Sequence, residues 1–168
     1  MTRSIERVLV VSKKSSYDLY VRQHKMRRVQ ELLRKKDPSV ERLIRADKHH
    51  RETLEEVRSA LKELGIKARF RDRAQRGSMD EFDLVVTVGG DGTLLSVSHQ
   101  LSTTPVLGIN SAPLDSVGFL AGAQKGNVLE RLTSIVEASL AQQVQAVKNR
   151  YDQEKAELEC TQQSETAK

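Results

Sequence analysis

The stretch Leu84-Val85-Val86-Thr87-Val88-Gly89-Gly90-Asp91-Gly92-Thr93 decides the fold of this chain of 168 residues. Its first half is an apolar run of the kind found in strands that are buried on both faces. Three glycines then end the run, and glycine both adopts conformations that other residues avoid and lets the main chain approach a ligand. A helix beginning here would direct unpaired N–H groups and a partial positive charge at a phosphate. The stretch therefore predicts a strand, a turn and a helix that bind a nucleotide phosphate.

Strand and helix patterns alternate on both sides of this turn, which predicts a parallel sheet covered by helices. We expect strands over 8–11, 66–70, 83–88 and 105–109. The predicted fold is α/β and Rossmann-like, with a mostly parallel sheet of about four or five strands flanked by helices.

Helices are expected between these strands. A helical pattern runs from Tyr17 to about Lys36 and is broken at Asp37-Pro38-Ser39, because proline disfavours helix at the residue before it. A short helical turn is expected over 40–44. The next helix carries an apolar stripe at spacings of three and four residues, and Gly65 is expected to cap its end. The stripe consists of Leu54, Val57, Leu61 and Leu64.

The last part of the chain differs in composition, with neither glycine nor proline beyond Gly126. We expect an amphipathic helix over 128–136 to pack on a domain spanning 1–138, and a helical or disordered tail over 139–168. The final residues, 161–168, are expected to be disordered. Apolar residues recur in the tail at spacings typical of a surface helix or a short coiled-coil strand. They are Leu140, Val144, Val147, Tyr151 and Leu158.

Composition argues against a membrane or secreted protein. No apolar run approaches the roughly 20 residues needed to cross a bilayer. The apolar run near the N-terminus is too short for a signal peptide. Cys160 is the only cysteine, which excludes an internal disulfide and fits the reducing cytoplasm as the expected location.

The net charge of +5 arises largely from basic residues between Arg22 and Lys36. A solvated helix face explains this cluster, and so does steering of a polyanionic small ligand such as ATP or a dinucleotide. Nucleic acid is not expected as a partner, because no interleaved aromatic residues or known binding motif accompany the charge.

Asp91 is the candidate catalytic residue. A carboxylate that faces phosphates can hold Mg²⁺, directly or through water, or accept the proton of an attacking hydroxyl. Thr93 can cap the following helix and offer its hydroxyl to phosphate. Neither a Walker P-loop nor the pattern Gly-x-Gly-x-x-Gly occurs in the chain. The alternative is a tight turn in which glycine merely permits packing, and three glycines in four residues argue against it.

The pentapeptide Gly89 to Thr93 resembles a motif shared by NAD kinases, phosphofructokinases, and the diacylglycerol and sphingosine kinases. A second pair of segments narrows this choice. Val106-Leu107-Gly108-Ile109-Asn110 followed by Ser116-Val117-Gly118-Phe119-Leu120 looks like the second signature of NAD kinases, and Val10 to Ser15 fits the first strand and loop of that family. The chain resembles the amino-terminal α/β domain of NAD kinases over about residues 7–131.

The resemblance implies transfer of the γ-phosphate of ATP, or of a phosphate of polyphosphate, to the 2′-hydroxyl of the adenosine ribose of NAD. The product is NADP, and Mg²⁺ accompanies the donor. Asp91 matches the essential aspartate that is regarded as the general base of the family. For Asn110, a side chain that satisfies the backbone of its own turn is an equal alternative. No metal ligand is assigned, and the implied NAD- and ATP-binding residues are Gly89, Gly90, Gly92, Thr93, Asn110 and Phe119.

NAD kinases have a second, mostly β domain, with an Asn-Glu or Asn-Asp pair for the nicotinamide-side ribose. No such pattern follows Arg131. Two explanations remain: a truncated or frame-shifted NAD kinase, and a non-catalytic nucleotide-binding or assembly module. Turnover by this chain alone is not implied, because positioning both substrates supplies much of the rate enhancement. The family also implies a homo-oligomer, although much of that contact comes from the second domain.

The histidines and the cysteine are assigned no chemistry. His49 and His50 are adjacent, so they cannot share one helix face as metal ligands do, and an exposed polar helix is expected there. His99 is expected to be a surface or packing residue, and Cys160 a bystander thiol. No Ser/His/Asp set is suggested by spacing.

Overall fold

The computed structural model describes residues 4–166, with side-chain surroundings for residues 4–155. Residues Ile5–Thr133 form one compact unit, called here the α/β unit, and most of the second unit is helix beyond Thr133. The α/β unit contains a five-stranded sheet in which all neighbouring strands are parallel. This confirms the predicted α/β fold. The strands are β1 (Arg7–Ser12), β2 (Lys67–Asp72), β3 (Leu84–Gly89), β4 (Val106–Asn110) and β5 (Ala123–Gln124).

The order of the strands, β2-β1-β3-β4-β5, creates a switch point between β1 and β3. The chain crosses from β1 to β2 on one side, whereas β3 and β4 extend the sheet on the other side. In open α/β sheets, ligands bind outside the carboxyl ends of the strands at such a point. Ser12 pairs with Val88, and Gly89 pairs with Asn110. The end of β1, the glycine turn and Asn110 therefore lie on one edge of the sheet.

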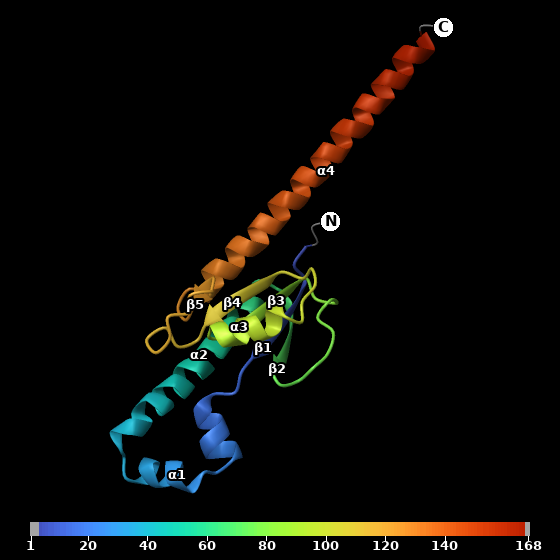
Figure 1. Ribbon diagram of the computed structural model, residues 1–168. Helices are drawn as coiled ribbons and strands as arrows, with labels where there is room; N and C mark the ends of the chain where they lie inside the picture. Colours follow the sequence, from blue (N-terminus) through green and yellow to red (C-terminus); the bar gives the residue numbers. More distant parts are fainter. Residues whose placement is uncertain (1–3, 167–168) are drawn as a thin grey trace. The chain divides into compact units, whose positions relative to one another are not determined.

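Two helices cover opposite faces of this sheet (Figure 1), namely α2 (Glu41–Glu63) and α3 (Asp91–Ser98). On the face of α3, Leu9, Val11 and Val85 of the strands form a buried cluster with Val97 of the helix. The loop between β2 and β3 adds Met79 to this cluster. The alternate strand residues are buried on the other face, where α2 contacts β2 and β3.

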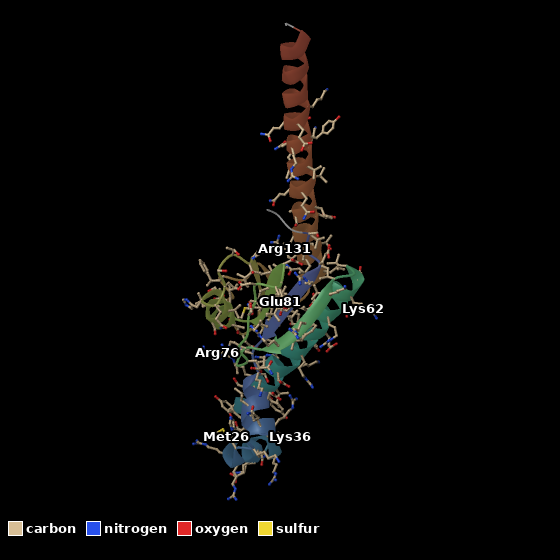
Figure 2. All side chains as sticks on the ribbon, turned by 90° about the vertical axis from the view of Figure 1, so that its right-hand side faces the viewer. Met26, Lys36, Lys62, Arg76, Glu81 and Arg131 are labelled. Carbon is tan, nitrogen blue, oxygen red and sulfur yellow. The ribbon has the colours of Figure 1, made fainter. Side chains whose placement is uncertain are left out.

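The segment before α2 differs from the single helix predicted over 17–36. It forms a π-helical stretch, η1 (Asp18–Gln23), then α1 (Arg27–Arg34), then a 3₁₀ turn, η2 (Pro38–Val40). Lys25 has a φ of 48° and breaks the helix, because the left-handed conformation cannot continue an α-helix. None of the α1 residues is buried. Met26 and Lys36, which flank α1, are labelled in Figure 2.

The second predicted helix is longer than expected. The turn predicted over 40–44 and the helix with the apolar stripe are one continuous helix, α2. Its end agrees with the prediction, because α2 is capped at Leu64 and Gly65 follows with a φ of 68°. Such a left-handed residue after the cap is the usual way in which glycine ends a helix.

The tail is helical, which is one of the two predicted alternatives. A single helix, α4 (Val128–Thr166), continues the predicted helix over 128–136 into the tail. The disorder predicted over 161–168 is wrong as far as Thr166, and residues 167–168 lie outside the described chain. The apolar tail residues named above are exposed as far as they are described, up to Tyr151. Among the described residues, no helix combines the length and apolar character needed to span a membrane.

Candidate functional site

The glycine turn joins the carboxyl end of β3 to the first turn of α3. Gly90 is the N-cap of α3 and has extended backbone angles, φ −111° and ψ −173°. Gly89 is required at its position because an added Cβ would overlap Thr93 Oγ1 and lie 3.0 Å from Thr93 Cβ. The Thr93 side chain is 1% exposed, and its hydroxyl has no hydrogen-bond partner among the described residues. A buried hydroxyl without a partner is uncommon, so its place at a helix N-terminus makes it a candidate ligand contact.

Asp91 is the first residue of α3, and its carboxylate already has two backbone partners. The N–H of Phe119 donates to Oδ2, and the N–H of Leu120 donates to Oδ1, both at 3.0 Å. The carboxylate thus ties the glycine turn to the segment that carries the second family signature. Each carboxylate oxygen has a further lone pair, so Asp91 can still accept a proton or approach a cation.

The Asn110 side chain forms hydrogen bonds with the backbone of its own turn. This was one of the two alternatives predicted for Asn110, the other being contact with the ligand. Its Nδ2 donates to the carbonyl of Ser116 at 2.8 Å, and its Oδ1 accepts from the N–H of Ala112 at 3.1 Å. Gly118, with a φ of 61°, packs directly against it, since an added Cβ would lie 2.7 Å from Asn110 Cγ. The side chain is buried and orders the loop that follows β4.

Phe119 lies beside the glycine turn, and its ring is exposed to solvent. The residue is 85% exposed, while its backbone N–H is fixed by Asp91. The structure therefore brings Phe119 to the site and leaves its aromatic face open. Gly92 is exposed as well, and an added Cβ there would meet no atom within 4 Å.

Asp115 fixes the same loop from the other side. Its Oδ1 lies 3.2 Å from Arg42 Nε and 3.1 Å from Arg45 Nη2, both on α2. The hydrogen bond from Arg45, together with the positive charges of Arg45 and Arg42, lowers the pKa of Asp115 below its usual value. The loop between β4 and β5 is thus held by α2 through Asp115 and by α3 through Asp91.

The prediction of an exposed polar helix at His50 is wrong. His50 is 5% exposed, and its Nδ1 lies 2.9 Å from the hydroxyl of Ser111, which is 3% exposed. Burial lowers the pKa of His50, so the ring is uncharged at neutral pH. The sequence contained a signal for this burial, namely helical spacing. Thr53 and His50 precede Val57 by four and seven residues and therefore lie on the same face of the helix as Val57. This is the buried face of α2.

Asp47 is the second residue that the sequence did not reveal. Its carboxylate is buried and accepts a hydrogen bond from the hydroxyl of Ser15. Arg22 Nη2 also donates to it at 3.0 Å, and Arg51 Nε lies 3.5 Å away. A buried carboxylate must be paired in this way. Asp47 thus joins the loop after β1, η1 and α2 at the carboxyl edge of the sheet.

The model of the family described as "ATP-NAD kinase N-terminal domain" matches residues 1–140. The chain belongs to the NAD kinase family. The matched residues include the glycine turn, Asn110 and Phe119, so the family assignment and the edge described above concern the same part of the chain.

Individual NAD kinases share shorter stretches with the chain. The NAD kinase of Natronomonas pharaonis is 43% identical over 60 residues, which cover 36% of this chain and 21% of that protein. The NAD kinase of Chloroherpeton thalassium is 52% identical over 42 residues, covering 25% of this chain and 14% of its own length. The NAD kinase of Clostridium perfringens is 45% identical over 56 residues, which cover 32% of this chain and 19% of that protein. The chain matches about a fifth or less of the length of these relatives.

The described residues hold no group of three or more His, Cys, Asp or Glu side chains that could form a metal site. Mg²⁺ commonly binds through one or two carboxylates together with substrate phosphates. Asp91 is the carboxylate that the glycine turn carries, and the chain offers no cage for a resident ion within its described part.

Proposed function

We propose that this chain binds NAD and MgATP at the carboxyl edge of its sheet and takes part in NADP formation. In the reaction, the 2′-hydroxyl oxygen of the adenosine ribose attacks the γ-phosphorus of ATP, or a terminal phosphorus of polyphosphate. The bond to the leaving phosphate oxygen breaks, and the hydroxyl loses its proton. The observation that best supports this proposal is the position of the glycine turn at the β1–β3 switch point, in a chain of the NAD kinase family.

The residues of the turn have distinct roles in this proposal. The N–H groups of Gly90 and Gly92 and the unpartnered hydroxyl of Thr93 contact phosphate. Gly89 lets Thr93 pack close to the end of β3. Asp91 accepts the proton of the attacking hydroxyl, for which a carboxylate oxygen with a free lone pair suffices.

Two further residues support the ligand indirectly or at its edge. Asn110 keeps the loop after β4 in place through its two backbone hydrogen bonds. The exposed ring of Phe119 offers an apolar face to the dinucleotide. Homo-oligomer formation and a cytoplasmic location belong to the same proposal; the first rests on the family alone, and the second on the single cysteine and the short apolar run near the N-terminus.

A non-catalytic nucleotide-binding or assembly module is the second candidate. It is favoured by the hydrogen bonds of Asp91, because both carboxylate oxygens order the segment at Phe119 and Leu120. That structural role does not require turnover.

The test is NADP formation from NAD, ATP and Mg²⁺ by the purified chain, with NAD binding measured in parallel. We expect Asp91→Asn to lower turnover by roughly 10²-fold or more, the usual contribution of a general base. Asp80→Asn is the matched control, because Asp80 is exposed in the loop between β2 and β3. Binding of NAD without turnover would favour the module, and failure to bind either substrate would refute both candidates.

A further inference from the structure

A cavity of about 310 Å³ lies at the carboxyl edge of the sheet, beside the glycine turn. Three segments line it: the loop after β1, the start of α2 with η2, and the residues that follow β4. The side chains that matter for its chemistry are Lys13, Ser15, Ser39, Arg42, His50 and Ser111. None of the five glycine-turn residues from Gly89 to Thr93 lines the cavity, so it is a separate compartment of the same edge.

The charge of the lining is positive. Lys13 and Arg42 contribute cations, and no carboxylate is among the residues that line the cavity within the described chain. Arg42 is paired with Asp115. The Lys13 ammonium has no carboxylate within ion-pair distance in the described part of the molecule, so its charge is available to an anion.

The inner wall is polar and uncharged. His50 and Ser111 are both buried and bonded to each other through Nδ1 and Oγ. Burial is the main cause that lowers the pKa of His50, and the positive charge of Lys13 lowers it further. A neutral imidazole and several hydroxyl groups can exchange hydrogen bonds with phosphate oxygens while Lys13 supplies the charge.

Size and position narrow the class of ligand. Small-molecule sites usually have volumes of about 300–1,000 Å³, so this cavity suits a chain of phosphates better than a whole dinucleotide. No Phe, Tyr or Trp lines it among the described residues, and an adenine ring would find no aromatic partner for stacking. The cavity begins at the end of β1, one side of the switch point at which such sheets bind ligands.

We propose that this cavity seats the phosphate chain of the phosphoryl donor, with Lys13 as its principal cation and the His50–Ser111 pair as its neutral wall. The inference rests on the proposed function, which supplies the need for a donor. The shared chemistry is a linear phosphoanhydride, which either ATP or inorganic polyphosphate can provide.

The test is calorimetric titration of the full chain with tripolyphosphate, ATP and NAD, each alone, comparing the native sequence with Lys13→Gln and Lys14→Gln. Lys14 is the matched control, because it is the next residue along the chain, donates to Gln23 Oε1 at 3.1 Å and does not line the cavity. We expect Lys13→Gln to weaken tripolyphosphate and ATP about tenfold. Neither substitution is expected to change the affinity for NAD.

Several results would overturn the inference. The first two are an unchanged affinity of Lys13→Gln for tripolyphosphate and an equal loss of affinity in Lys14→Gln. The others are no binding of tripolyphosphate to the native chain, and a loss of affinity in Lys13→Gln that is confined to ATP. In the last case the adenosine, rather than the phosphate chain, would depend on the cavity. NAD binding without tripolyphosphate binding would overturn the cavity alone. Lys13-dependent tripolyphosphate binding without NAD binding would support the cavity and contradict the proposed function.

Discussion

At the scale of single residues, the glycine turn depends on one close approach. The Thr93 side chain is buried against Gly89, and its backbone N–H donates to the carbonyl of Gly90 at 2.8 Å. Thr93 is β-branched and confined to few rotamers within a helix. It therefore cannot move aside for a side chain at position 89. The same packing keeps its hydroxyl at the start of α3, where we expect phosphate to bind.

Gly89→Ala should destabilise the fold by about 1–3 kcal/mol, the usual cost of forcing extra atoms into a packed site. Gly92→Ala is the control, because a Cβ there meets no atom within 4 Å and the residue lies in α3. It should stabilise the chain by about 0.5–1 kcal/mol, since alanine favours helix more than glycine does. Urea unfolding measures both values. Equal effects of the two substitutions would contradict this account of the turn.

His50 should make stability depend on pH. Above about pH 6.5 the imidazole is uncharged in the folded and the unfolded chain. Because burial lowers the pKa of the folded form, the unfolded chain binds a proton first as the pH falls below that value. The free energy of unfolding should then decrease. Lys13, Asp47 and Asp18 also influence this ring, through their charges.

The measurement is urea unfolding between about pH 5 and 8. His50→Gln should show a weaker loss of stability below about pH 6.5 than the native chain does. His99→Gln is the control, because His99 is exposed at the end of α3. The account is wrong if His50→Gln retains the full decline, or if His99→Gln removes it.

At the scale of elements, side chains of α2 organise the segments that follow the strands. Arg42 and Arg45 hold Asp115 in the loop after β4. Further along the same helix, Glu56 accepts hydrogen bonds from the N–H groups of Gly126 and Val128 at 3.0 and 3.1 Å. Glu56 thereby satisfies donors at the start of α4 that have no partner within that helix. The position of α2 thus decides both where the site loop lies and where α4 begins.

Glu56→Ala should lower the free energy of unfolding by about 1 kcal/mol, the typical cost of losing a side chain that caps a helix. Glu55→Ala is a matched control on the same helix, where Glu55 forms an exposed pair with Arg58. Such pairs contribute at most about 1 kcal/mol and often nothing measurable. A cost for Glu56→Ala no larger than that for Glu55→Ala, measured by urea unfolding, would show that the cap is unimportant.

At the scale of the whole chain, the features predicted correctly from sequence are local ones. The run into Gly89 and the cap at Gly65 each depend on a few neighbouring residues, and both lie where the pattern indicated. The burial of His50 depends instead on Ser111, 61 residues away. The strand β5 forms only because β4 offers it an edge. Contacts of this kind follow from the assembled sheet, so no local pattern could reveal them.

The candidate site divides in the same way. The glycine turn and Asp91 were apparent from composition and order alone. The hydrogen bonds that Asp91 accepts from the backbone N–H groups of Phe119 and Leu120 join segments about 28 residues apart. The cationic cavity likewise needs the loop after β1, α2 and the end of β4 to meet. Sequence reasoning therefore found the turn and missed the compartment beside it.

The most direct test of the central claim, that nucleotide phosphates bind at the glycine turn, is amide-resolved NMR. The ¹⁵N-labelled chain would be titrated with MgATP and then with NAD. We expect the backbone N–H signals of Gly90, Gly92 and Thr93 to shift when the nucleotides are added, because these groups lie at the N-terminus of α3. A titration that leaves these three signals in place, or shifts only signals distant from the carboxyl edge of the sheet, would contradict the account.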